Sequence, residues 1–193
     1  MKHLLPAALL LLLPGCISFG AKPPPTLLTL APARQMAVGA QQSSAGARSL
    51  VVQVPVTASS LATVRVPVQA TATTLAYLKD AAWAEPPARL FARLLSDTLT
   101  AGGTVVLSGV QSVDSPAGNL SGELRNFGVD ATSREAVVTF DAALTRGGAP
   151  TAIEKRRFEA RVPVATIDAA TVGPALNDAA NRVADEVAGW AGR

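Results

Sequence analysis

The residue types that most often carry protein chemistry are scarce in this sequence. The only histidine is His3 and the only cysteine is Cys16. If the N-terminal segment that contains His3 is removed on export and Cys16 is modified, the mature chain carries neither an imidazole nor a free thiol. That composition excludes histidine-dependent triads, thiol catalysis and zinc sites built from His and Cys, as well as an intrachain disulfide. Carboxylates, Lys, Ser and Tyr remain as possible catalytic groups. We nevertheless expect that the protein is not an enzyme and binds neither a cofactor nor a metal ion.

Cys16 ends a segment built like an export signal. A short basic start is followed by a leucine-rich run to Leu13, which is too short to span a membrane as a lasting anchor. Leu13-Pro14-Gly15-Cys16 is similar to the bacterial lipobox, although Pro14 stands where Ala, Ser or Thr is usual. The motif predicts cleavage after residue 15 and lipidation of Cys16. The alternative is an ordinary secretory signal with an incidental cysteine.

Lipidation would fix the chain to a membrane. Several acyl chains anchor a protein stably, at about 0.8 kcal/mol per buried methylene, where one chain does not. Ile17 follows the cysteine. Because aspartate at that position is the familiar inner-membrane retention signal, its absence predicts a lipid-anchored protein on the periplasmic face of the outer membrane.

The sequence divides into three parts. Residues 1–15 are the expected lipoprotein signal peptide, residues 16–25 the lipidated cysteine with a proline-rich tether, and residues 26–193 a single domain. In an extended polyproline form, residues 17–25 would span at most about 28 Å. The 17 Lys and Arg against 14 Asp and Glu form no basic run, so nucleic-acid binding has weak support.

The elements that would position the functional residues are readable from periodicity. Alternating apolar and polar residues predict eight strands, at 26–30, 50–56, 62–69, 75–78, 104–107, 120–125, 136–145 and 153–164. A loop is expected at 31–47, and turns at 114–118 and 146–150. Apolar stripes at helical spacing predict one helix between Pro87 and Gly102 and another over 168–191, capped by Asp168 or Thr171. These elements predict an α+β fold, a mostly antiparallel sheet packed against two amphipathic helices in a single domain.

Several segments follow a known order. The stretch 75–87 combines a short strand containing tyrosine with a Trp-Ala-Glu-Pro turn that leads into a leucine-rich helix. Further matching pieces are Gly122-Glu123-Leu124 followed by Phe127, the strand 136–144 and the segment 179–184. Together with the lipobox, this order resembles the ABC-type transport auxiliary lipoproteins, the group that contains the PqiC-like, MCE-associated proteins. The likeness covers roughly residues 26–190.

The resemblance implies a function in transport. It implies an outer-membrane-anchored periplasmic lipoprotein that serves an MCE/ABC-type system moving lipids or other hydrophobic molecules across the envelope. The implied partners are an MCE-domain protein, docked by this chain, and the outer membrane, reached through acyl chains on Cys16. Binding of lipid cargo and a homo-oligomer are left open. The alternatives are a structural lipoprotein of another envelope assembly or secretion machine, and a periplasmic hydrolase.

Three residues are candidates for partner or lipid binding. Tyr77 and Trp83 flank the strand-to-helix turn, and aromatic side chains of this kind dominate interface hot spots. Trp83 could instead fill the core with its N–H bonded to a backbone carbonyl, and Tyr77 is open to both interpretations. Arg156 belongs to the densest basic cluster and could meet anionic lipid headgroups, or it could mark a solvated strand end. For Asp80 and Glu85 we expect turn bonding and helix N-terminal charge.

Overall fold

The computed structural model describes residues 26–45, 49–107, 118–147 and 152–192. The expected signal peptide, Cys16 and the tether lie outside the described residues. So do residues 114–117 of one expected turn and 148–150 of the other.

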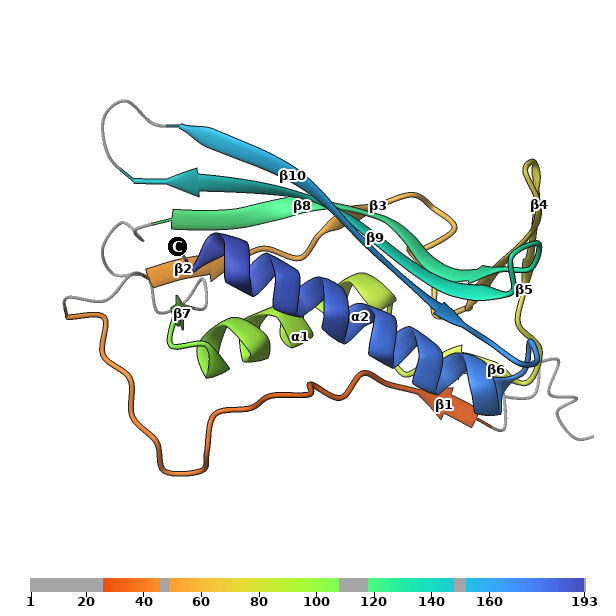
Figure 1. The fold of residues 1–193 in the computed structure, drawn as a ribbon, viewed down its shortest axis with the longest axis horizontal. Helices are drawn as coiled ribbons and strands as arrows, with labels where there is room; N and C mark the ends of the chain where they lie inside the picture. The colour runs from red at the N-terminus through yellow and green to blue at the C-terminus, as the bar shows by residue number, and fades with distance from the viewer. Residues whose placement is uncertain (1–25, 46–48, 108–117, 148–151, 193) are drawn as a thin grey trace, which may run out of the picture.

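Ten strands and two helices are described. In chain order they are β1 (Thr26–Leu28), β2 (Ser49–Val52), β3 (Val56–Thr57), β4 (Pro67–Thr71), β5 (Thr74–Tyr77), β6 (Ala81–Trp83), α1 (Pro87–Ala101), β7 (Val105–Leu107), β8 (Gly118–Asp130), β9 (Glu135–Arg146), β10 (Ile153–Pro163) and α2 (Ala169–Ala191). Figure 1 shows the long strands in one layer and the two helices side by side beneath them.

Three long antiparallel strands form the frame of the main sheet. Its order is β10-β9-β8-β2-β7, and β9 pairs with β10 over eleven residues without a register shift. On β10 the side chains of Phe158 and Ala160 are buried while those of Arg157, Glu159 and Arg161 are exposed. The alternation expected for 153–164 is therefore confirmed, with one face against the helices and one toward solvent.

The α+β class and the two helices are confirmed, but the sheet is mixed rather than antiparallel throughout. β2, β3 and β4 follow one another along the same edge of β8, and all three run parallel to it. The strand expected at 50–56 is broken into β2 and β3, because Pro55 has no N–H for a ladder. The strand expected at 62–69 begins only at Pro67, and β1 pairs with β6 outside the main sheet.

Both helices bury the apolar stripes that the sequence indicates. α1 begins directly after Pro86 and is followed by Gly102, and α2 is capped by Asp168, whose carboxylate accepts the N–H of Thr171 at 3.0 Å. The buried stripe of α1 contains Leu90, Phe91, Leu94, Leu95 and Leu99, and that of α2 contains Leu176, Ala180, Val183 and Val187. Their burial between sheet and helix supplies the hydrophobic stabilisation of the fold.

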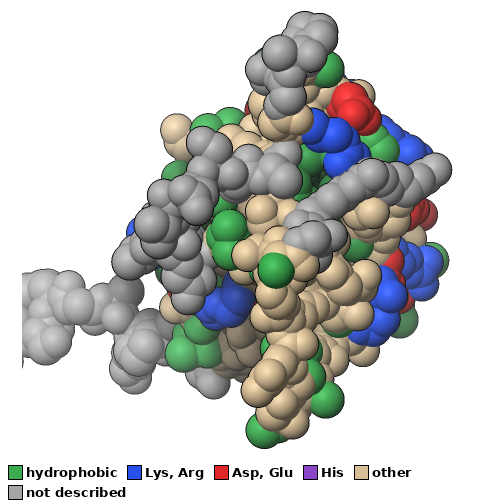
Figure 2. Space-filling model, turned by 90° about the vertical axis from the view of Figure 1, so that its left-hand side faces the viewer, with side chains coloured by type: hydrophobic (Ala, Val, Ile, Leu, Met, Phe, Trp, Pro, Cys, Tyr) green, Lys and Arg blue, Asp and Glu red, His purple; other side chains and the backbone are tan. Residues whose placement is uncertain are grey.

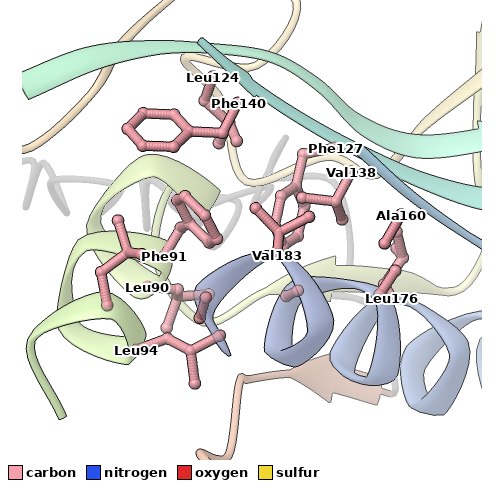
Figure 3. Packing of buried hydrophobic residues seen from close by; sticks show 14 of the residues in the cluster. Leu90, Phe91, Leu94, Leu124, Phe127, Val138, Phe140, Ala160, Leu176 and Val183 are labelled. Carbon is pink, nitrogen blue, oxygen red and sulfur yellow. The ribbon is translucent and has the colours of Figure 1, made fainter. Parts of the chain in front are cut away.

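An aromatic chain runs through the centre of this core. The ring of Phe127 lies edge-to-face against Trp83, with centroids 5.3 Å apart, and Phe91 makes the same kind of contact with Phe140 at 5.3 Å. Phe91 and Phe127 join the two pairs at 6.2 Å. Figure 3 shows Phe91 of α1 pointing toward the sheet residues Phe140 and Phe127. Because such contacts add to area burial, this chain links α1 to the sheet.

The loop expected at 31–47 is tied to α2 where it begins. The side-chain oxygen of Asn181 accepts the N–H of Ala33 at 2.7 Å, and its amide donates to the carbonyl of Ala31 at 3.0 Å. Asn177 accepts the N–H of Ala31 at 2.8 Å. Two asparagines one helical turn apart therefore hold the start of this loop against α2 (Figure 1).

Close packing between β4 and β8 depends on one glycine. A Cβ at Gly128 would lie 2.4 Å from the carbonyl oxygen of Pro67. We expect Gly128→Ala to lower the free energy of unfolding by about 1–3 kcal/mol, measured by urea denaturation, because the two strands would have to separate. The control is Gly189→Ala in α2, where a Cβ meets no atom within 4 Å. There alanine should raise stability by about 0.5–1 kcal/mol, and an equal loss at both sites would contradict the steric argument.

Candidate functional site

Tyr77 lies at a cavity formed by four elements, β1, β4, β5 and the start of α2. A cavity of about 540 Å³ is lined by Thr26 of β1, by Val68 of β4, by residues 76–80 and by residues 167–170 at the start of α2. Thr26 is the first residue after the expected tether, so the cavity lies at the end of the domain where the tether joins it. Its lining is mostly apolar, with Lys79, Asp80 and Asp168 exposed around it.

The polar groups around this cavity are held in place. The guanidinium of Arg65 lies over the ring of half-buried Tyr77, 3.7 Å from its centroid, in a cation–π contact. Asp168 accepts hydrogen bonds from the Thr166 hydroxyl and the Thr171 N–H, and these bonds hold the pKa of its carboxyl below the usual range. The cavity therefore presents an ionised carboxylate and an oriented phenol beside an apolar surface, which suits contact with an amphiphilic surface.

Trp83 belongs to the core and not to this surface. Its side chain is 1% exposed and is packed against Phe127. Among the described residues no hydrogen-bond partner reaches its indole nitrogen, so the expected bond to a backbone carbonyl is wrong. A side chain this deeply buried offers no area to a partner.

Arg156 lies far from Tyr77 along the fold. Its guanidinium stands 4.8 Å from the centroid of Phe158, whose ring also contacts Trp190 near the end of α2. The Tyr77 cavity, in contrast, is lined by the start of α2. The three candidate residues thus form no single site: one is in the core, and the other two lie at opposite ends of α2.

The expected structural roles of the two acidic residues near Trp83 hold in part. Glu85 precedes α1 and binds Arg93 of that helix with 2.6 Å between carboxylate oxygen and guanidinium nitrogen, but no side chain caps the first turn of α1. Asp80 adopts a left-handed backbone conformation, with φ at 56°, in the turn between β5 and β6. Neither arrangement resembles a pair of carboxylates poised for acid–base chemistry.

The solvent face of the sheet carries charged side chains, and several of them form ion pairs. Arg157 binds Asp141 through two parallel hydrogen bonds of 2.5 and 2.7 Å, which lower the pKa of that carboxyl. Arg161 contacts both Glu159, at 2.8 Å, and Glu135, at 3.3 Å. Figure 2, which looks at the end of the molecule where β9 meets β10, shows basic side chains gathered on one side with acidic ones among them.

Metal chemistry and membrane spanning find no support in the described part of the chain. No group of three or more His, Cys, Asp or Glu side chains there is placed to hold a metal ion. None of the helices described is both long and apolar enough to cross a bilayer.

The sequence matches a known family over most of its length. The family described as "ABC-type transport auxiliary lipoprotein component" matches residues 28–188. The chain belongs to this family. As a transport auxiliary lipoprotein it takes part in ABC-type transport, and its family is not a class of enzymes.

Solved structures support the fold of this auxiliary lipoprotein. A crystal structure of a Xanthomonas campestris protein of the DUF330 family is similar with a TM-score of 0.66 at 22% identity, covering 86% of this chain and 91% of that chain. A crystal structure of an uncharacterized protein is similar with a TM-score of 0.64 at 19% identity, covering 74% and 91%. No curated protein matches the sequence.

Sequence reasoning missed most of what surrounds Tyr77. Asp168 is distant from it in the sequence, Arg65 directly precedes the hairpin formed by β4 and β5, and neither belongs to a recognisable motif. The Arg65 contact follows from the β4–β5 hairpin, in which Pro67 opposes Tyr77 and the N–H of Leu78 bonds the carbonyl of Val66, but the sequence alone does not give that register. For Asp168 a signal did exist, since its helix-capping position places it at the start of α2, but its proximity to β5 requires the tertiary fold.

Proposed function

We propose that this auxiliary lipoprotein is anchored to the periplasmic face of the outer membrane by acyl chains on Cys16 and docks the MCE component of an ABC-type lipid transport system. The observation that carries the proposal is the family match over residues 28–188, preceded by the lipobox at 13–16. The long buried core and the absence of histidine after residue 3 agree with a protein that works by contact rather than by bond-making.

Co-purification from the native envelope tests this function. Full-length, tagged protein would be cross-linked in cells, solubilised in mild detergent and recovered. We expect an MCE-domain protein together with the ATPase and permease of its transporter, and cells that lack the lipoprotein should become more permeable to detergent. Recovery of a different envelope assembly without any MCE protein would refute the proposal.

The Tyr77 cavity is the proposed contact surface at the tether end. Tyr77→Ala removes a half-buried ring together with its contact to Arg65, so we expect the unfolding free energy to fall by about 1–2 kcal/mol, which leaves the domain folded, and the yield of the MCE protein to fall several-fold. The yield is measured by quantitative mass spectrometry of the recovered complex.

The matched control for Tyr77 is its neighbour Leu75. Leu75 lies on the same strand, is 40% exposed and lines a different cavity. Leu75→Ala should leave the recovery unchanged. If both variants recover the partner as well as the unmodified protein does, Tyr77 has no part in docking. The lipoprotein would then dock its partner through another surface.

A further inference from the structure

β10 presents a long open edge of the main sheet. It is the terminal strand in the sheet order, and among the described residues no strand pairs with its outer side. Its eleven residues extend about 36 Å at the usual rise per residue. β7, at the other end of the order, has only three residues. A long unpaired edge is a template for the addition of another strand.

The backbone groups that face outward can be assigned. Val164, directly after β10, donates its N–H to the carbonyl of Arg134 at 2.9 Å, and these two residues continue the register in which Phe158 opposes Phe140. In an antiparallel ladder, pairs that exchange both hydrogen bonds alternate with pairs that exchange none. The even-numbered residues of β10 therefore bond β9, and the odd-numbered ones direct their N–H and C=O groups to the open side.

The position of the proline agrees with this assignment. Pro163 is the last residue of β10 and is odd-numbered, so the N–H that it lacks would have pointed outward. Proline is tolerated in a sheet where its nitrogen faces away from the ladder. Among the odd-numbered residues from 153 to 161 no other proline occurs, so five outward N–H groups remain for pairing.

The side chains along this edge carry net positive charge. The odd-numbered residues include Lys155, Arg157 and Arg161 against a single acid, Glu159. Arg157 and Arg161 are engaged by carboxylates of their own sheet. Among the described residues, however, no carboxylate forms an ion pair with Lys155 or with its neighbour Arg156. The unneutralised charge therefore lies in the first half of the strand.

We propose that the outer edge of β10 binds an extended, acidic segment of a partner protein as an added strand. Main-chain hydrogen bonds to the odd-numbered residues would supply the affinity, and carboxylates opposite Lys155 would set the register. A second copy of this chain fits less well, because it would bring two edges of the same net charge together. This inference deepens the proposed docking function and rests on it, since the docked transport component would provide the segment.

The test uses full-length protein in detergent and a defined probe. The probe is an eleven-residue peptide of alternating Glu and Val, and the matched control peptide alternates Lys and Val. We expect the acidic peptide to bind, measured by fluorescence anisotropy, and the basic one not to bind. Lys155→Pro removes one outward N–H and leaves the β9 ladder intact, so it should weaken binding by about tenfold or more relative to Lys155→Val, which removes only the charge.

Hydrogen exchange of individual amides gives an independent readout. In the free protein the amides of Arg156 and Phe158 should be protected and those of Lys155 and Arg157 should exchange fast, and the acidic peptide should slow the exchange of the latter pair. If Lys155→Pro does not fold, Lys155→Glu serves instead and should weaken binding of the acidic peptide while favouring the basic one.

Three results would overturn the inference. One is equal binding of the acidic peptide to Lys155→Pro and Lys155→Val. Another is protection of the odd-numbered amides that rises with protein concentration, which would assign the edge to a second copy. The third is no binding of the acidic peptide to the unmodified protein. If the MCE component still co-purifies with the lipoprotein in any of these cases, only the β10 edge is refuted and the docking function stands.

Discussion

Trp83→Ala is expected to lower the free energy of unfolding by about 3–5 kcal/mol, the largest loss of stability from any single substitution proposed for this protein. The side chain is 1% exposed, and its ring begins the aromatic chain that continues through Phe127 to Phe91. Alanine leaves a cavity between β6 and β8 that the rigid strands cannot close. Since domains of this size are stable by roughly 5–15 kcal/mol, the variant should lose a large fraction of its total stability. Urea denaturation followed by far-ultraviolet circular dichroism measures the change.

Trp83→Phe is the matched control, and it separates volume from hydrogen bonding. Phenylalanine keeps most of the ring contact with Phe127 and removes the indole N–H, which has no partner among the described residues. Because a buried, unpaired donor is itself unfavourable, its removal offsets part of the lost volume, and we expect Trp83→Phe to cost much less than Trp83→Ala. Equal losses for the two variants would contradict the argument that Trp83 stabilises the fold mainly through the volume of its ring.

The helices and the long strands could be predicted because their signals are local. Five buried apolar residues of α1 recur at helical spacing between a proline pair and a glycine pair, so both its bounds and its buried face follow from neighbouring residues. On β10 the alternation of Phe158 and Ala160 with charged residues likewise identifies the buried face. Each of these elements needs only its own sequence to choose a conformation and a face.

The mixed sheet could not be predicted, because pairing direction is a long-range property. Leu50 opposes Gly118 and Val68 opposes Val129, so one strand, β8, aligns segments that lie more than sixty residues away in the sequence. The alternation of apolar and polar residues on β2 or β4 is the same whether the neighbouring strand is parallel or antiparallel, so it does not reveal the direction of pairing. The Tyr77 cavity could not be predicted for the same reason, since it is formed by residues of β1, β4 and β5 together with the start of α2. The sequence indicates only one residue of this cavity as a binding candidate, Tyr77, and not the charged groups around it.

The register of β10 adds information that no sequence pattern contains. Alternation shows which side chains of β10 are buried, but it does not show which backbone groups face β9. The single hydrogen bond from Val164 to Arg134 decides that question for the whole strand. Docking through β10 would leave the Tyr77 cavity accessible, because that cavity lies at the start of α2 and is lined by no residue of β10. The β10 edge and the Tyr77 cavity are therefore separate surfaces of one domain, and a partner bound at one leaves the other free for contact.

Cys16→Ser is expected to move the protein from the membrane fraction to the soluble periplasmic fraction almost completely. Serine cannot take a thioether-linked lipid, and a chain without acyl groups retains no described helix that could hold it in a bilayer. Each buried methylene contributes about 0.8 kcal/mol, so several acyl chains together stabilise membrane attachment far more than any exposed side chain of the domain could. Fractionation with immunoblotting, together with mass spectrometry of the mature N-terminus, measures the outcome.

The effect on transport separates the anchor from the docking surface. If the anchor serves only to place the domain near its partner, the soluble Cys16→Ser protein should still recover the MCE component from detergent extracts, because the domain fold is unchanged. In cells, however, it should restore detergent resistance poorly, since the tether no longer concentrates it at the outer membrane. Gly15→Ala is the control, because a small residue still precedes the cysteine and processing should continue. A Cys16→Ser protein that stays in the membrane fraction after its leader has been removed would show that the chain is anchored by something other than lipid on this residue, and the assignment of the outer membrane would then lose its chemical basis.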